Sequence, residues 1–177
     1  REFASPNGVA VFTEADGTPR LYVADTDNNR ILGFADARKV KPGDRADIVI
    51  GQPDFARILV NYPSNSPNER TASSLALPRA VAVDRAGNLW VADTANSRVL
   101  RFPSPFAAGF TGAADLVLGQ SNFISLVSDP TSRTMSAPTS LAFTVEGLLT
   151  VADASPRRGA VVPLGTPADE ARRVIAE

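Results

Sequence analysis

The sequence contains no cysteine and no histidine. Without cysteine there is no disulfide framework and no thiolate metal site. Without histidine, neither a Ser-His-Asp triad nor a Cys-His pair can form within the chain. The 177 residues carry 18 basic and 19 acidic side chains, and this net charge of −1 gives no overall reason to expect a nucleic acid or an anionic membrane as partner. The missing cysteine and histidine thus argue against the usual nucleophilic hydrolases, and the near-zero net charge argues against binding driven by overall charge.

Long apolar runs are also missing. No stretch of 18 apolar residues occurs, so we expect no transmembrane helix. The opening residues 1–4 do not resemble a signal peptide. The basic doublets 157–158 and 172–173 lie near acids or prolines and not among aromatics, which argues against an RNA-binding face. The absence of cysteine does not fix the compartment, and we favour an extracellular or periplasmic location, as for a secreted bacterial protein.

One phrase occurs three times in the chain. It reads LYVADTDNNRILGF from Leu21, LWVADTANSRVLRF from Leu89 and LTVADASPRRGAVV from Leu149, with starts 68 and 60 residues apart. Each copy reads as a strand, an acidic turn, an arginine and a second strand. Self-similarity of this kind indicates a repeat architecture.

The repeat extends to both sides of this phrase. A Pro-x-x-(Val/Leu)-Ala-(Val/Phe) segment precedes every copy, and an apolar run closed by Gly-Gln-x-x-Phe follows the first two. Each unit is therefore predicted to hold four short strands separated by turn residues. The first strands are expected near 8–12, 79–84 and 139–144, the second near 21–25, 88–93 and 148–153, the third near 30–34, 98–102 and 158–162, and the fourth near 47–51, 115–119 and 172–176. Four antiparallel strands per repeat are typical of a β-propeller blade.

The second copy carries a family resemblance. Residues 87–93 (GNLWVAD) followed by 96–99 (NSRV) resemble the core of an NHL repeat, and residues 21–32 are similar. The third copy departs from it, with Pro156 and Arg157 in place of the Asn-Asn or Asn-Ser pair. The resemblance implies an all-β fold, an NHL-type β-propeller with three four-stranded antiparallel blades, in one segment 1–177 with blades at about 3–55, 75–123 and 135–177. NHL propellers serve as protein-binding modules, RNA-binding modules, sensor domains and lyase-like enzymes.

The number of units leaves the ring open. Propellers have about 4–8 blades, so three blades would leave two uncovered sheet faces. Either the chain is part of a longer protein or copies of it associate. The connections are long, at 35–45, 56–74, 103–114 and 124–136, and residues 166–172 are predicted to form a short helix.

Three aspartates end the second strand of each unit, and an arginine follows each of them five residues later: Asp25 with Arg30, Asp93 with Arg98, and Asp153 with Arg158. They could form a ring of carboxylates that binds a cation. They could also be structural, each carboxylate accepting backbone N–H bonds and pairing with its arginine. Recurrence in every unit favours the structural interpretation, because a catalytic group is normally needed once.

Two further recurring sets have the same two interpretations. Asn28 and Asn96 belong to Asn-rich turns, in which Asn tolerates the left-handed conformation. Gln52 and Gln120 lie in the Gly-Gln-x-x-Phe segments, where we expect the glutamines to bond the neighbouring blade and Phe55 and Phe123 to pack between blades. The alternative is a ligand surface formed by the two asparagines and the two glutamines.

The core is predicted from the apolar runs of the first and second strands. Trp90 alternates with its neighbours and should therefore pack against an adjacent blade. The residues expected to be largely inaccessible are Val81, Val83, Leu89, Val91, Leu141, Phe143 and Val151.

The resemblance also bears on function. Lyase-like members of the group use histidines for zinc and for acid–base work, and those positions have no counterpart here. We expect a non-catalytic binding or scaffold module without a cofactor, which binds a protein or a small-molecule ligand through its loops. The alternative is a calcium-assisted hydrolase or lyase of the gluconolactonase-like propeller type, with its remaining blades outside this chain.

Overall fold

Two four-stranded antiparallel sheets form the first two units. The computed structural model describes residues 2–127, 133–154, 160–161 and 174–175. The first sheet has the order β1 (Pro6–Thr13), β2 (Pro19–Asp25), β3 (Arg30–Phe34) and β4 (Ile48–Ile50). The second repeats this order with β5 (Pro78–Val83), β6 (Leu89–Asp93), β7 (Arg98–Phe102) and β8 (Leu116–Leu118). The expected strands of these two units are confirmed.

The third unit differs from the expected four-stranded blade. β9 (Pro138–Phe143) pairs with β10 (Leu149–Asp153), and β11 (Ala160–Val161) pairs with β12 (Val174–Ile175), as two separate two-stranded sheets. Three four-stranded blades were thus the wrong count for the part of the chain that the structure describes. The third copy has Pro156 and Arg157 where the others have turn-forming Asn and Ser, and proline has no N–H to donate. The predicted helix at 166–172 lies outside the described residues.

The hairpin between the first two strands of each unit is closed by an acidic or hydroxyl residue and a glycine. In the second unit the Asp84 carboxylate accepts hydrogen bonds from the N–H groups of Ala86 (2.9 Å) and Asn88 (3.0 Å). The Gly87 N–H donates to the Asp84 carbonyl (3.0 Å), and Gly87 has a φ of +83°, which favours glycine. These turns fix the register that faces Val81 toward Val91 and Val83 toward Leu89.

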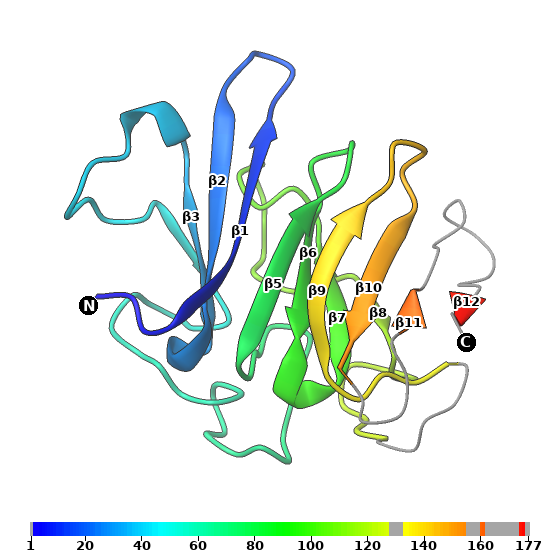
Figure 1. The fold of residues 1–177 in the computed structure, drawn as a ribbon. Coiled ribbons are helices and arrows are strands. Elements are labelled where there is room, and N and C mark those ends of the chain that lie inside the picture. The colour runs from blue at the N-terminus through cyan, green and yellow to red at the C-terminus, as the bar shows by residue number, and fades with distance from the viewer. Residues whose placement is uncertain (1, 128–132, 155–159, 162–173, 176–177) are drawn as a thin grey trace.

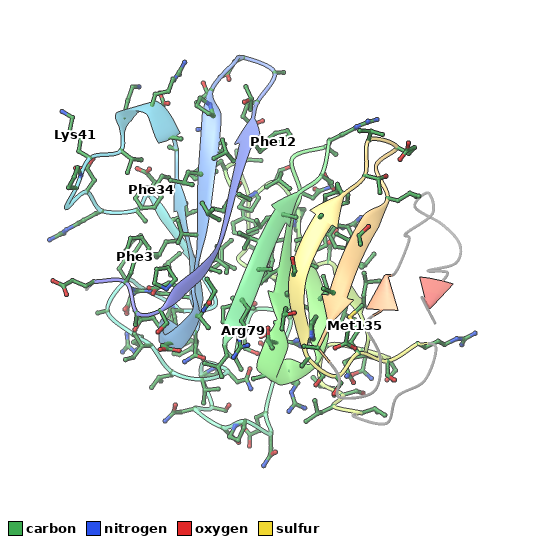
Figure 2. The ribbon with its side chains drawn as sticks, in the orientation of Figure 1. Phe3, Phe12, Phe34, Lys41, Arg79 and Met135 are labelled. Carbon is green, nitrogen blue, oxygen red and sulfur yellow. The ribbon has the colours of Figure 1, made fainter. Side chains whose placement is uncertain are left out.

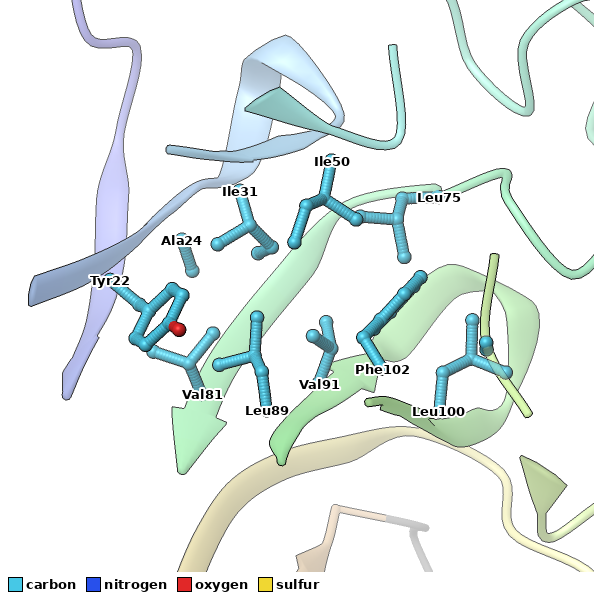
Figure 3. Close-up of a cluster of buried hydrophobic side chains, with 11 residues drawn as sticks. Tyr22, Ala24, Ile31, Ile50, Leu75, Val81, Leu89, Val91, Leu100 and Phe102 are labelled. Carbon is cyan, nitrogen blue, oxygen red and sulfur yellow. The ribbon is translucent and has the colours of Figure 1, made fainter. Parts of the chain in front are cut away.

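The sheets stack face to face, with β1, β5 and β9 side by side (Figure 1). The first core lies between the first and second sheets, where Tyr22, Ala24, Ile31 and Ile50 meet Val81, Leu89, Val91, Leu100 and Phe102 (Figure 3). A second core lies between the second sheet and the β9–β10 sheet, and contains Trp90, Val99, Met135, Leu149 and Val151. Every core is therefore shared by two successive units. Within the described residues no helix is long and apolar enough to cross a membrane.

Most of the expected core residues are buried. Val81, Leu89, Val91 and Val151 are buried as predicted. Val83, Leu141 and Phe143 are only half-buried. Val83 and Phe143 are the last residues of β5 and β9, next to the exposed turns, which explains their partial accessibility, whereas Leu141 lies two residues further in.

One apolar face has no sheet against it. Val9 and Val11 on β1 are 67% and 60% exposed, because their side chains point away from the second sheet. Phe3 and Phe34 lie on the same outer side (Figure 2). The β1 side of the outer face of the first sheet is thus an uncovered apolar surface, whereas Leu32 and Phe34 on the same face are buried.

Gly51 provides a test of the packing between the first two units. It has a φ of +93°, and a Cβ there would lie 2.7 Å from Leu75 Cδ1 and 2.9 Å from the Asn29 carbonyl oxygen. Gly17 has a φ of +80° with nothing within 4 Å of its Cβ direction. We predict that Gly51→Ala lowers the free energy of unfolding by about 1–3 kcal/mol more than Gly17→Ala does, because only Gly51 adds overpacking to the shared backbone strain. Urea titrations of the two variants check this, and equal losses would contradict it.

Trp90 is the single tryptophan, so its fluorescence reports on one site. Its ring is 5% exposed and lies edge-on to Phe143 at a centroid distance of 6.0 Å, and its indole N–H donates to Asp84 (2.9 Å). The prediction that it packs against the adjacent unit is confirmed. We expect emission at shorter wavelength than in the unfolded chain and weak quenching by acrylamide, and a solvent-like emission from the folded protein would contradict this placement.

Candidate functional site

Two buried ion pairs connect the second and third strands of the first two units. Arg30 Nε lies 2.7 Å from Asp25 Oδ2, and Arg98 Nε lies 2.7 Å from Asp93 Oδ2. All four side chains are nearly inaccessible, and the paired residues face each other in the strand register. The expected pairing across the turn is therefore confirmed in both units.

Each carboxylate has two further donors at matching positions. In the second unit Asp93 accepts from the Ala76 N–H (2.7 Å) and from the Asn96 side-chain amide (2.8 Å). In the first unit the same two bonds reach Asp25 from Ala4 (2.7 Å) and Asn28 (2.9 Å). Thus Asn28 and Asn96 are buried members of the ion-pair cluster.

The electrostatics of this cluster are dominated by burial. Desolvation raises the pKa of the Asp93 carboxyl, and the Arg98 guanidinium with the Ala76 and Asn96 donors opposes that rise. The donors of this carboxylate all belong to the fold itself.

The third aspartate keeps part of the pattern. Asp153 is buried, and its carboxylate accepts from the backbone N–H groups of Ser136 (2.9 Å) and Ala137 (2.6 Å). Its expected partner Arg158 lies outside the described residues.

The residue after each of the first two aspartates connects a unit to the next one. The Thr26 hydroxyl donates to the Pro78 carbonyl (2.7 Å), and the Thr94 hydroxyl donates to the Pro138 carbonyl (2.6 Å). Both threonines start short 3₁₀ turns, η1 (Thr26–Asn28) and η3 (Thr94–Asn96), which end on left-handed residues, Asn29 and Ser97, with φ of 52° and 53°. We call these two hydroxyl contacts the threonine links.

The glutamines hold the connection that follows each fourth strand. Gln52 Nε2 donates to the carbonyls of Asn29 (3.0 Å) and Leu59 (2.7 Å), and Gln52 Oε1 accepts from the Leu59 N–H (3.2 Å). Gln120 makes the same three bonds, to Ser97 O (3.0 Å), Val127 O (3.0 Å) and Val127 N (2.8 Å). The glutamines therefore bond their own unit and its following loop, not the neighbouring blade as expected, because the loop folds back toward the 3₁₀ turn.

The aromatic residue of the same segment contributes through its backbone as well. The carbonyls of Phe55 and Phe123 accept from Nη1 of Arg30 (2.7 Å) and Arg98 (2.5 Å). The Phe123 ring packs against the core between the first two sheets, as predicted. The Phe55 ring is exposed instead, because the equivalent face of the first sheet has no neighbour.

Two buried residues were missed by the sequence analysis. Arg70 donates to Asn96 Oδ1 (3.2 Å), and Asn61 exchanges two amide hydrogen bonds with Asn96, at 3.1 and 2.7 Å. Burial and the neighbouring Arg98 lower the pKa of Arg70. Only the recurrence of Arg-Thr at 70–71 and 133–134 could have pointed to this position.

A hollow of about 780 Å³ lies on the outer face of the first sheet. Phe3, Arg30, Leu32, Phe34, Arg45 and Phe55 are among its lining residues. In the second unit the corresponding arginine, Arg98, also donates to the carbonyls of Thr71 (3.1 Å) and Ser74 (2.8 Å), whereas Arg30 borders the hollow. Within the described residues no group of three or more His, Cys, Asp or Glu side chains is placed to hold a metal ion.

The ion pair is tested by removing its acid. Asp93→Ala would leave the buried Arg98 unpaired, so we predict a loss of about 3–5 kcal/mol in the free energy of unfolding. The control is Asp115→Ala, which breaks an accessible pair with Arg101 and should change that energy by about 1 kcal/mol or less. Chemical denaturation measures both, and a near-wild-type Asp93→Ala would refute the structural role.

Comparison with known proteins agrees with the repeat. The model of the NHL repeat matches residues 75–102, which hold β5, β6, η3 and β7 together with the Asp93–Arg98 pair. No curated protein matches the chain. The resemblance stated from the sequence is thus confirmed for the second unit, and the chain carries an NHL repeat at residues 75–102.

Proposed function

We propose that the chain is a non-catalytic binding or scaffold module, a single NHL-type propeller segment over residues 1–177 with units at about 3–55, 75–123 and 135–177. The observation that carries this proposal is that the recurring polar side chains form hydrogen bonds with other groups of the same chain. Among the described residues no buried side-chain nitrogen or oxygen lacks a hydrogen-bond partner. A ligand role for Asn28, Asn96, Gln52 and Gln120 stays a prediction, and their burial and bonding favour the structural role.

The loops after the fourth strands supply the candidate binding surface. Their frames are the same, since Gln52 clamps Leu59 and Gln120 clamps Val127 at the same spacing. The sequences of the two loops differ and read PDFARI at 53–58 and SNFISL at 121–126. A constant frame that carries different exposed residues is typical of a scaffold that displays binding loops.

The second of these loops has the stronger apolar character. Ile124, Leu126 and Val127 are 68%, 44% and 42% exposed, although the loop is held by Gln120. Exposed apolar side chains on a fixed backbone bind at low entropic cost, so a peptide or a protein surface is the partner class that this loop fits best.

The test uses a displayed peptide library selected against the purified 177-residue chain. We expect enriched peptides that bind the wild type and lose at least about tenfold in affinity for Ile124→Ser/Leu126→Ser, since two buried apolar contacts would be removed. The matched control is Val145→Ser, a residue that is 80% exposed on the opposite hairpin turn and should bind as wild type. Fluorescence anisotropy of a labelled peptide gives the affinities.

Two outcomes would overturn the proposal. One is a selection in which no peptide is enriched, or in which the loop variant binds as well as the control. The other is a melting temperature that rises with millimolar calcium together with calcium-dependent hydrolysis of a lactone, which would favour the hydrolase interpretation.

A further inference from the structure

The outer face of the first sheet repeats a face that is already covered inside the molecule. In the strand register, Val9, Val11, Leu21, Val23, Leu32 and Phe34 lie on the outer face of the first sheet. The equivalent positions of the second sheet are Val81, Val83, Leu89, Val91, Leu100 and Phe102. The residue type is identical at all six positions. In the first set Val9 and Val11 are exposed and no sheet packs against them, although Leu32 and Phe34 are buried, whereas the second set packs on the first sheet.

The molecule therefore shows what covers this face. The second sheet receives the opposite face of the first sheet, which presents Ala10, Tyr22 and Ala24 from its first two strands and Ile31 and Ile50 from the other two. At the same register positions the third unit presents Ala142, Thr150 and Ala152 on its outward side, and both alanines are exposed. The part of the covering face formed by the first two strands thus recurs in the third unit with both alanines exposed, and with a threonine in place of the large aromatic ring.

We propose that the outer face of the first sheet docks a second copy of this chain, through the outward face of that copy's third unit. The contact continues the established interface between the first and second sheets, and it does not depend on what the loops bind. The two end faces differ, so two copies can satisfy each other reciprocally in a two-fold dimer. The copy that docks would also cover the exposed rings of Phe3 and Phe55 that border the hollow.

The threonine links indicate how this contact differs from the internal ones. Thr26 and Thr94 each donate to the first residue of the next unit's first strand, but the third unit has Ala154 at the equivalent position. A contact between copies lacks this hydroxyl and should be weaker than the contacts within the chain. A threonine introduced at position 154 should therefore strengthen the association of the copies.

The experiment is sedimentation velocity of the 177-residue chain over a concentration series. We expect the wild type to dimerise reversibly, and Ala154→Thr to lower the dimer dissociation constant by about 2-fold to 10-fold, as one or two added hydrogen bonds allow. Val9→Lys/Val11→Glu should remain monomeric, because it places charges on the uncovered face. At concentrations where the wild type is monomeric its thermal unfolding should match the wild type, since both side chains are exposed. Ala108→Glu, at an exposed position of the loop between β7 and β8 in the second unit, should dimerise as the wild type does.

A wild type that stays monomeric at all concentrations overturns the proposal, and so does a dimer that persists in Val9→Lys/Val11→Glu. Because Ala154→Thr must strengthen association, the proposal stays testable if the charged variant fails to fold. An affinity unchanged by Ala154→Thr would show that the third unit does not make the contact.

Discussion

The Asp–Arg pair behind each 3₁₀ turn is the interaction on which the arrangement of the units depends. In the second unit its members reach β6, β7, the segment that enters β5 and the loop that leaves β8. One buried cluster thus holds four separate segments together at the end of the sheet where β6 runs into β7. A charge pair taken out of water is expensive unless its remaining hydrogen-bonding groups are satisfied, and here neighbouring backbone groups satisfy them. The requirement explains why Asp, Asn and Arg recur at constant spacing while the loops between them change.

Sequence reasoning succeeded where a pattern recurs and involves nearby residues. The strand positions of the first two units, the Asp93–Arg98 pair and the placement of Trp90 follow from repetition and alternation. Where long-range geometry decides, it was wrong for Gln52 and made no prediction for Arg70. The direction of the Gln52 side chain depends on how a loop folds back, and the burial of Arg70 depends on Asn61 and Asn96 converging from distant segments. A repeat unit specifies its own strands, but not which distant loop lies over its end.

The third unit shows how departures from the repeat act physically. Ala154, Pro156 and Arg157 replace the threonine, the amide donor and the left-handed residue that the other turns use. Asp153 retains the backbone donor of the other units, here Ser136, and accepts a second one from Ala137, so the entry into β9 is still held by this carboxylate. The same carboxylate position can therefore survive after part of its cluster has changed, because the backbone bonds do not depend on side-chain identity.

The glutamine side chains fix the backbone of the loops without fixing which side chains the loops expose. Gln52 and Gln120 bond only backbone atoms of their loops, so exposed side chains such as Ala56, Ile124 and Leu126 lie outside the buried clusters, whereas the Phe123 ring packs on the core. Substitutions at the exposed positions change what the surface presents and leave the buried clusters intact. This division lets the exposed loop residues differ between units while the glutamine frame stays the same, and it makes the exposed positions of these segments, Phe123 excepted, suitable for grafting new sequences.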